Sequence, residues 1–220
     1  METMYNTLLQ LPLFQGLAQE DFTNILGKVK LHFTQHRAGE VLVKKDAICD
    51  RLIFVLKGRI SSSVSSVGNT YTFTELFEAP YLIEPQALFG MNTCFTSTCV
   101  SSVETHTVNI SKAFIFNELF KYEIFRLNYM NIISNRVQVL NNRLWVEIPE
   151  STEERILNFI FSHIERLSGE KILKIKMETL ADIINDTRLG VSKVLNGMQE
   201  RGLLELHRGE IVIPEVSRLI

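Results

Sequence analysis

The chain has 220 residues, 45% of them hydrophobic, and a formal net charge of -2 from 23 Lys and Arg against 25 Asp and Glu. This length and apolar content predict one or two domains with buried cores. Because there is no overall basic excess, any contact with nucleic acid must come from basic side chains placed on one face. The three cysteines, Cys49, Cys94 and Cys99, argue against a disulfide framework and are too few for a four-thiolate metal site.

The N-terminal segment lacks the features of a secretory signal. Residues 1–5 carry no basic start, and no apolar run approaches the roughly 18 residues that a membrane-spanning helix requires. We therefore expect a cytoplasmic protein without a membrane partner.

The first half of the chain changes from helical to strand-like spacing. Apolar residues between positions 14 and 29 recur at helical spacing and predict an opening helix. From residue 31 to residue 110, short runs rich in Val, Ile, Phe and Thr are separated by turn residues. Many short strands with regular turns predict a sandwich or a barrel-like roll.

The spacing becomes helical again and predicts a long helix over about residues 112–146. Within it, five apolar residues are spaced by three and four: Met130, Ile133, Val137, Leu140 and Leu144. Such a stripe often packs against the core of its own chain, but a narrow stripe flanked by polar residues is typical of a coiled coil. We interpret this stripe as the interface of a parallel homodimer.

A proline at position 149 interrupts this helix and marks a domain boundary. The chain is therefore divided into residues 1–148 and residues 149–220. The second part begins with a predicted helix whose first turn is acidic, at Glu153 and Glu154. Its apolar positions are Ile156, Ile160, Ile164 and Leu167.

Residues 180–195 predict two short helices around a tight turn. Leu180, Ile183 and Ile184 form one apolar face, Asn185-Asp186 provides the break, and Thr187 is the expected N-cap of the next helix. In that helix the residues expected to point inward are Val191, Val194 and Leu195. The outward face carries Arg188, Ser192 and Lys193, which suits the major groove of DNA.

The segment after this helix predicts a wing. An apolar strand over 203–206 is followed by a basic turn at 207–210 and a second strand over 211–213. A packing helix, a helical pair and a wing in this order predict a winged helix that binds DNA. Gly190 and Gly197 lie inside the second helix at a cost of about 1 kcal/mol each. Close approach of that helix to DNA or to its partner helix would explain Gly190.

The order of these parts resembles the Crp/Fnr family of bacterial transcription regulators over nearly the whole chain. The motifs that carry the resemblance are residues 37–40 (RAGE), 54–59 (FVLKGR) and 187–195 (TRLGVSKVL). It implies an α+β fold with a cyclic-nucleotide-binding-type β-roll, a long dimerisation helix and a C-terminal winged helix-turn-helix. It also implies a homodimer that binds a near-palindromic DNA site and contacts RNA polymerase.

The effector site of the family does not carry over. Pro85 stands where cyclic-nucleotide binders have a glutamate, Phe95 stands where they have an arginine, and Leu140 replaces a hydroxyl residue; Glu84 lies one position early. A buried phosphate without a cationic partner is strongly disfavoured, so we predict no binding of cyclic AMP.

Other sensing chemistries find little support. A fourth thiolate for an iron-sulfur cluster is missing. The histidines near the strands, at positions 32, 36 and 106, are more often structural than haem ligands, and a redox pair of Cys94 and Cys99 is a weaker alternative. We predict no cofactor and no metal, and an unidentified small organic effector, or none, stays open.

The DNA-contacting residues of the family carry over in part. Arg188 matches the first base-contacting arginine and suits guanine O6 and N7. The resemblance puts Leu189 in place of a glutamate, which adds a surface for a thymine methyl group, and Lys193 in place of an arginine. Thr187 and Ser192 are expected to contact phosphates, with Arg208 in the wing as a second backbone contact.

Two other classes of function are alternatives to a DNA-binding regulator. An enzyme or a ligand-binding signalling module would need a phosphate loop, a nucleophile motif or a carboxylate pair, and none is found, so we predict no catalytic residues. A degenerate family member would act through protein contacts alone. Specific DNA binding would separate that alternative from a DNA-binding regulator.

Overall fold

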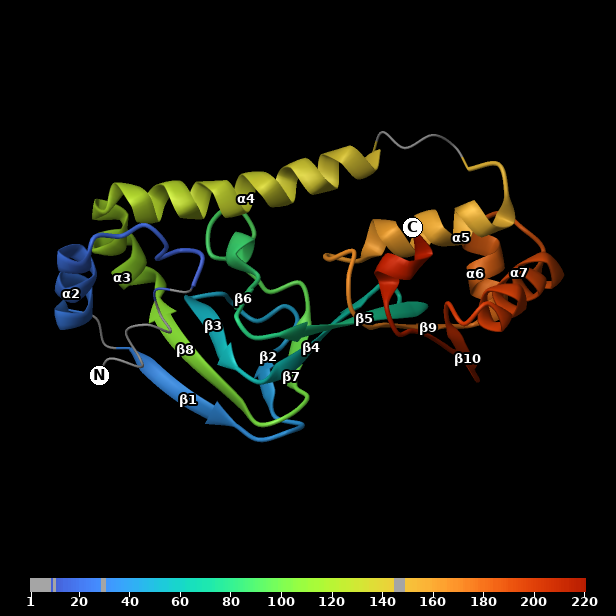
Figure 1. Ribbon diagram of the computed structural model, residues 1–220, viewed down its shortest axis with the longest axis horizontal. Coiled ribbons are helices and arrows are strands. Elements are labelled where there is room, and N and C mark those ends of the chain that lie inside the picture. The colour runs from blue at the N-terminus through green and yellow to red at the C-terminus, as the bar shows by residue number, and fades with distance from the viewer. Residues whose placement is uncertain (1–8, 10, 29–30, 145–148) are drawn as a thin grey trace. The chain divides into compact units, whose positions relative to one another are not determined.

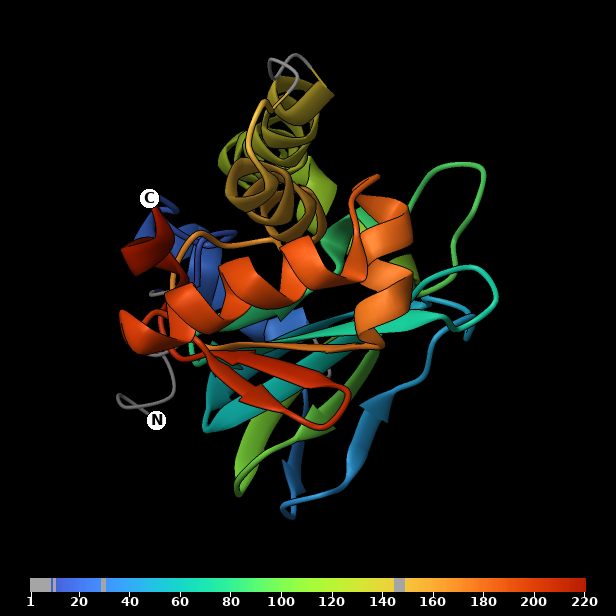
Figure 2. The same cartoon turned by 90° about the vertical axis from the view of Figure 1, so that its right-hand side faces the viewer.

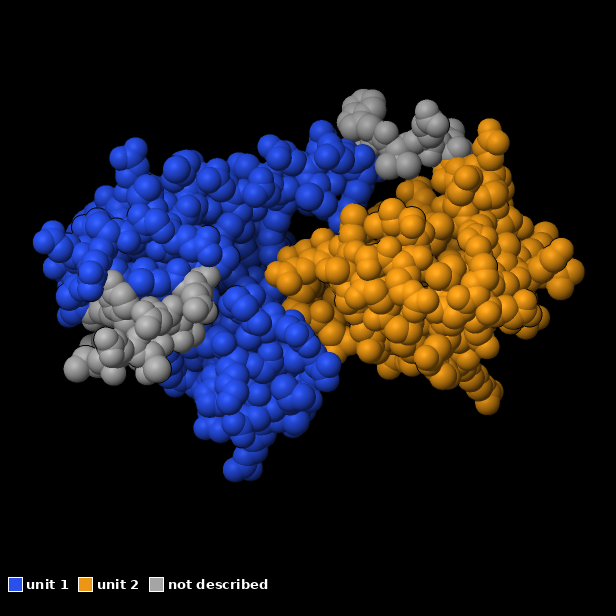
Figure 3. Space-filling view, viewed as in Figure 1, with its two compact units in different colours: residues 1–60, 78–144 blue, residues 61–77, 145–220 orange. Residues whose placement is uncertain are grey.

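The computed structural model describes residues 9, 11–28, 31–144 and 149–220, which form two compact units (Figure 1). The first unit contains residues 1–60 and 78–144, and the second contains residues 61–77 and 145–220 (Figure 3). A hairpin from the first half of the chain is therefore part of the unit that contains the C-terminal helices. The division into functional domains at residues 148 and 149 stays a prediction.

The first unit is built around antiparallel strands. Its four-stranded sheet has the order β1-β8-β3-β6, with the bounds His32–His36, Thr105–Ser111, Arg51–Lys57 and Tyr81–Ile83. A second antiparallel pair joins β2 (Val41–Val43) to β7 (Thr98–Ser101). These strands confirm the strand-rich region that the sequence predicted.

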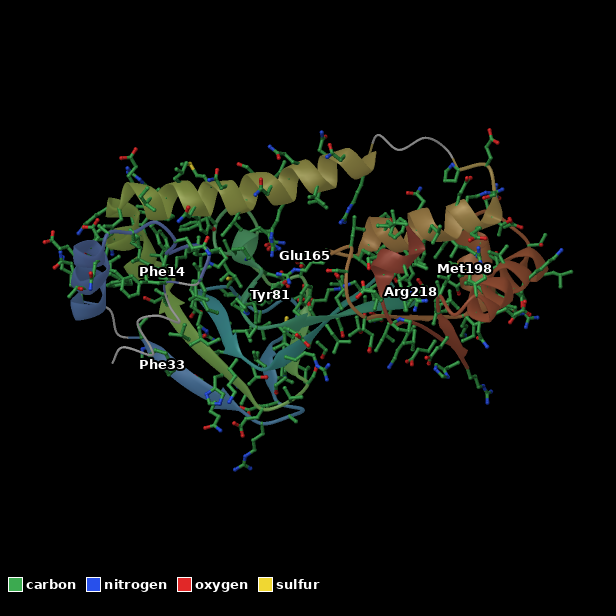
Figure 4. The ribbon with its side chains drawn as sticks, in the orientation of Figure 1. Phe14, Phe33, Tyr81, Glu165, Met198 and Arg218 are labelled. Atoms are coloured by element: carbon green, nitrogen blue, oxygen red, sulfur yellow. The ribbon has the colours of Figure 1, made fainter. Side chains whose placement is uncertain are left out.

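Aromatic rings fill the core of the first unit where the N-terminal segment crosses it. Phe14, labelled in Figure 4, precedes helix α2 (Gln19–Lys28) and lies 5.4–5.9 Å, ring centre to ring centre, from Phe22, Phe54 and Phe125. All four side chains are buried. Since each large ring buries much apolar surface, this cluster joins α2, β3 and the long helix α4 (Glu123–Leu144).

The long helix is shorter than predicted at its start. The predicted helix over 112–146 is divided into α3 (Lys112–Asn117), a 3-10 turn η2 (Leu119–Lys121) and α4. Aromatic and β-branched residues with low helix propensity, among them Ile115, dominate the first part, and burial of Ile115 and Leu119 holds the two short segments in place. The predicted end near residue 146 lies outside the described residues. No helix in the described residues is both long and apolar enough to cross a membrane.

The second unit has helices on one side of a sheet, as Figure 2 shows. Its strands have the order β10-β11-β9-β5-β4, with the bounds Glu205–His207, Glu210–Ile213, Lys171–Ile175, Tyr71–Glu78 and Arg59–Ser65. The helices are α5 (Thr152–His163), α6 (Met177–Ile183) and α7 (Arg188–Glu200), and a 3-10 turn, η3 (Val216–Leu219), ends the chain. Ser151 and Glu154 form a capping box at the start of α5.

Strand β5 completes the core of the second unit. It pairs antiparallel with β9, with Phe73 opposite Leu173 and Glu75 opposite Lys171. Phe73 is buried in the same cluster as the apolar residues of α5, α6 and α7. The sequence analysis predicted neither β9 nor this pairing, because a lysine occupies the first inward position of the strand and hides its alternation.

Two residues expected in this core are exposed. Leu167 is 51% exposed because α5 ends at His163. Just beyond that end, the backbone N–H groups of Glu165 and Arg166 donate to the carboxylate of Glu75 at 2.6 and 3.3 Å. Ile183 is 42% exposed because the buried face at this helix is formed by Leu180, Ala181 and the C-cap residue Ile184, so Ile183 lies at its edge.

A buried ion pair links β5 to β9. Lys171 is 0% exposed, and its Nζ lies 3.1 Å from Oε2 of Glu75 and donates to the carbonyl of Ser168 at 2.8 Å. Its ammonium group also lies 5.9 Å from the centre of the Phe77 ring. The same Glu75 carboxylate thus holds both the strand pair and the end of α5.

Replacement of this lysine by an apolar residue should destabilise the protein strongly. Lys171→Met leaves the Glu75 carboxylate buried without its cation, which is expected to lower the free energy of unfolding by roughly 3–5 kcal/mol. Urea unfolding of the purified variant measures the loss.

The neighbouring lysine of the same strand provides the control. Lys174 is exposed, and its Nζ lies 3.6 Å from Glu210, so Lys174→Met should change the stability by no more than about 0.5 kcal/mol. The double variant Lys171→Met with Glu75→Gln should lose less than the sum of the two single variants. Equal losses for the Lys171 and Lys174 variants would show that the buried pair has no special role.

Candidate nucleic-acid interface

The turn between α6 and α7 begins with a residue in the left-handed conformation. Asn185 has a φ of 53°, which Asn tolerates better than most residues because its short polar side chain bonds locally. The backbone N–H of Asp186 then donates to the carbonyl of Ala181 at 3.0 Å, and α6 ends. The predicted break at Asn185-Asp186 is therefore confirmed.

Helix α7 starts with the predicted N-cap. The hydroxyl of Thr187 accepts a hydrogen bond from the backbone N–H of Gly190 at 3.0 Å. A Cβ atom on Gly190 would lie 2.7 Å from Oδ1 of Asp186 and 3.1 Å from Oγ1 of Thr187. Crowding by the cap itself thus provides a reason for this glycine within the chain. Nothing in the structure explains Gly197.

The carboxylate of Asp186 ties the turn to the first turn of α5. It accepts hydrogen bonds from the Thr152 hydroxyl at 2.5 Å and from the backbone N–H of Thr187 at 2.6 Å, and the Arg155 guanidinium lies 3.6 Å away. The hydrogen bond from Thr152, and then the one from Thr187, hold the pKa of Asp186 below its usual value. Arg155 also donates to the carbonyl of Asn185 at 3.0 Å.

The sequence analysis did not identify Thr152 and Arg155 as part of the site. They lie 30 or more positions before the turn, and no local pattern connects them to it. The only signal in the sequence was an aspartate directly before an N-cap threonine.

The first two turns of α7 present the predicted contact residues. Arg188, Leu189 and Lys193 are exposed, Leu189 by 81%, and Thr187 is exposed at the cap. Ser192 is half-buried, and its hydroxyl accepts a long hydrogen bond of 3.5 Å from the amide of Asn196. The first turn of α7 has no acidic residue of its own, but the carboxylate of Asp186 lies directly before the cap and accepts from the backbone N–H of Thr187, so it partly offsets the positive end of the helix dipole.

The opposite face of α7 packs into the core of the second unit. Val191, Leu195 and Met198 are buried, and Val194 is half-buried; Met198 is labelled in Figure 4. The inward positions that the sequence predicted in this helix are therefore confirmed for Val191 and Leu195. Burial of this face fixes which side chains α7 presents outward.

The predicted wing is a two-stranded hairpin. His207 pairs with Glu210, and Arg208 and Gly209 form the tip. Gly209 has a φ of 75°, which glycine adopts without strain. Arg208 is exposed, and the side chain of Gln199 on α7 accepts from the backbone N–H of Leu206 at 2.9 Å. This bond ties the wing to the recognition helix.

The predicted dimerisation stripe lies mostly on the exposed surface of α4. Met130, Val137 and Leu140 are each exposed by 56–58%, and Ile133 is half-buried. The side chain of Leu144 lies outside the described part of the chain. Phe125 and Tyr129 cover the core instead, so the stripe is left without a partner in the isolated chain.

The residues at the expected effector positions carry no positive charge. Pro85 begins the 3-10 turn η1 (Pro85–Ala87), and both it and Phe95 are buried. Leu140 lies on the exposed face of α4. Cys49, Cys94 and Cys99 form no disulfide with one another, and burial raises the pKa of Cys49. No cluster of three or more His, Cys, Asp or Glu able to hold a metal is found among the residues described here.

Loss of the Asp186 charge should weaken the protein in a pH-dependent way. The folded pKa lies below the usual value of about 3.8, so the carboxylate stabilises the fold above that pH and stops doing so as the pH falls through the folded pKa. Asp186→Asn should therefore be less stable than the wild type at pH 7, and the difference should shrink below about pH 4. Urea unfolding between pH 3 and pH 7 measures it.

A second variant tests the cause of the shift. Thr152→Val removes the largest contribution to the lowered pKa and should reproduce the same pH dependence to a smaller extent. A stability difference between Asp186→Asn and the wild type that stays constant down to pH 3 would contradict this account of the turn.

Comparison with known proteins assigns the C-terminal part of the second unit. Residues 154–220 match the family model described as a Crp-like helix-turn-helix domain. Comparison with curated proteins gives no match. The fold of the chain is similar to solved structures at low sequence identity, three of which are described next.

The first is the catabolite activator protein of Thermus thermophilus, with 17% identity over 94% of this chain and 96% of that one and a TM-score of 0.51. The global regulator CLP of Xanthomonas campestris, described as responsive to c-di-GMP, has 14% identity over 90% of this chain and 99% of its own, with a TM-score of 0.50. DNR from Pseudomonas aeruginosa has 12% identity over 100% and 97%, with a TM-score of 0.50.

These matches agree with the order of strands, long helix and helix-turn-helix described above. Residues 154–220 are a Crp-like helix-turn-helix domain, in a chain whose overall fold is similar to those of the catabolite activator protein and CLP.

Proposed function

We propose that this protein is a transcription regulator that binds specific DNA sequences as a homodimer. The observation that carries the proposal is the Crp-like helix-turn-helix domain whose recognition helix, α7, exposes Arg188, Leu189 and Lys193 on its first two turns. A helix with this face suits the major groove, where guanine and thymine present acceptors and a methyl group. In this proposal residues 149–220 bind DNA and residues 1–148 form the effector-type domain.

Each contact residue has a distinct role in the proposal. Arg188 donates both arms of its guanidinium to guanine, Leu189 covers a thymine methyl group, and Lys193 supplies a point charge. Thr187 and Ser192 each accept a hydrogen bond within the chain and keep their own O–H to donate to a phosphate. Arg208 at the tip of the wing contacts the DNA backbone.

The apolar stripe on α4 supports the homodimer. Its exposed side chains, Met130, Val137 and Leu140, would leave water if two copies of α4 packed side by side. A two-fold dimer presents two recognition helices related by the same axis, which requires a near-palindromic site. In this proposal, dimerisation through the stripe therefore determines whether one or two half-sites are bound.

Several finer points belong to the same proposal. The uncharged Pro85 and Phe95 argue against cyclic AMP as the effector, and an unidentified small molecule, or none, takes its place. By analogy with the family, the partners are double-stranded DNA, a second copy of the chain and RNA polymerase. We infer a non-enzymatic protein of the cytoplasm.

Loss of Arg188 should reduce discrimination between sequences. Arg188→Ala is expected to weaken binding to a preferred duplex by about 1–3 kcal/mol more than binding to a random duplex, because a bidentate contact to one base is lost. Arg208→Ala should weaken both duplexes by the same factor. Fluorescence anisotropy titrations at one fixed salt concentration measure all four affinities.

An arginine outside α7 and the wing serves as the control. Arg218 lies exposed on η3, and Arg218→Ala should leave both affinities unchanged. If Arg188→Ala weakened the preferred and random duplexes equally, its assignment as a base-contacting residue would be wrong.

A charge in the α4 stripe should separate the dimer. Val137 is 58% exposed in the isolated chain, so Val137→Asp should leave the fold intact but bury an unpaired carboxylate at the interface. Sedimentation velocity should show monomers, with specific DNA binding lost. The adjacent Gln138 is exposed beside the stripe, and Gln138→Asp should stay dimeric. Dimers that persist in Val137→Asp would refute this interface.

A further inference from the structure

A buried carboxylate in the first unit has hydrogen-bond donors but no cation. Glu84, directly after β6, is only 6% exposed. Within the part of the chain that the structure describes, none of the ion pairs to Lys, Arg or His involves this carboxylate. Burial of such a group is costly unless its oxygens are hydrogen-bonded.

Four donors from two consecutive residues converge on this carboxylate. Oε2 accepts from the backbone N–H and the hydroxyl of Thr96, both at 2.8 Å. Oε1 accepts from the backbone N–H of Ser97 at 2.9 Å and from its hydroxyl at 2.5 Å. Ser97 is itself buried. Two adjacent amides with two hydroxyls form an anion-binding arrangement of the kind that holds oxyanions without a positive side chain.

The backbone of Glu84 is in a conformation that favours glycine. Its φ of 34° and ψ of 58° lie in the left-handed region, where a side chain is disfavoured. A glutamate here is therefore strained, and the hydrogen bonds of its carboxylate offset that strain. The side chain is held in this position by its contacts with residues 96 and 97.

The turn that follows Glu84 is bonded to the long helix. The carbonyl of Pro85 accepts from the hydroxyl of Tyr129 on α4 at 2.8 Å, and the side chain of Gln86 accepts from Arg136 on the same helix. Burial raises the pKa of Tyr129 to about 12, so it remains a donor at neutral pH. These two bonds hold η1, which directly follows Glu84, against α4.

We propose that the backbone amides and hydroxyls of Thr96 and Ser97 form an oxyanion site that the chain fills with its own Glu84 carboxylate. The carboxylate of Glu84 takes the place of a small anionic ligand. It keeps η1 packed against α4 when no such ligand is bound. All residues of the anion site belong to the first unit, so the anion site does not depend on the proposed function. Its consequence, a regulator that binds DNA without an anionic effector, rests on the function proposed above.

Removal of the side chain should open the site to an external anion. Glu84→Gly suits the left-handed backbone, so the variant loses the internal ligand without added strain. Its Tm should be lower than that of the wild type in sodium chloride. Sodium acetate at equal ionic strength and pH 7 should then raise it saturably by roughly 2–4 °C. The Tm of the wild type should not respond, because its site is filled.

Two further variants identify the donors and the charge. Adding Ser97→Ala to Glu84→Gly removes one hydroxyl and should reduce the response to acetate. Glu84→Gln fills the site with a neutral amide and should lower the Tm without any response to acetate. If Glu84→Gly did not fold, a Glu84→Gln variant as stable as the wild type would still overturn the proposal, as would equal responses of Glu84→Gly and the wild type to acetate.

DNA titrations of the same variants separate the two proposals. A response to acetate in a protein that binds no DNA would leave the anion site standing and reject the regulator. Specific DNA binding by a wild type whose Glu84→Gly variant ignores acetate would reject the anion site alone.

Discussion

The choice of side chains that the recognition helix, α7, presents outward depends on the carboxylate of Asp186. Asp186 holds the turn before α7 by accepting from Thr152 and from the backbone of Thr187, so the helix starts at a fixed point relative to α5. Thr187 then caps the helix, and Gly190 provides the space that this cap needs. With the start fixed and the inner face buried, only the outward side chains remain available to DNA.

Two other carboxylates also hold a turn in place by accepting hydrogen bonds from backbone amides. Glu75 accepts from the amides of Glu165 and Arg166 and ends α5, and Glu84 accepts from the amides of residues 96 and 97. In each case a side chain takes backbone donors that no helix or strand satisfies. The three sites explain why the two units contain irregular turns at well-defined positions.

The sequence predicted those parts of the molecule that local chemistry determines. The Thr187 cap and the buried Val191 follow from cap preference and helical spacing, and both were found. Parts that depend on distant residues were missed. Strand β9 was missed because Lys171 occupies an inward position, where its charge is balanced by the carboxylate of Glu75, 96 residues earlier in the chain. The contacts of Asp186 with α5 were missed for the same reason.

The most direct measurement of the central claim is selection of bound sequences from a random duplex library by the purified protein without added ligand, at one fixed salt concentration. The account predicts enrichment of a motif with two-fold symmetry, with half-sites one or more helical turns apart. Enrichment of a motif without symmetry would contradict the homodimer. Failure to enrich any motif would contradict a regulator that binds specific DNA without an effector.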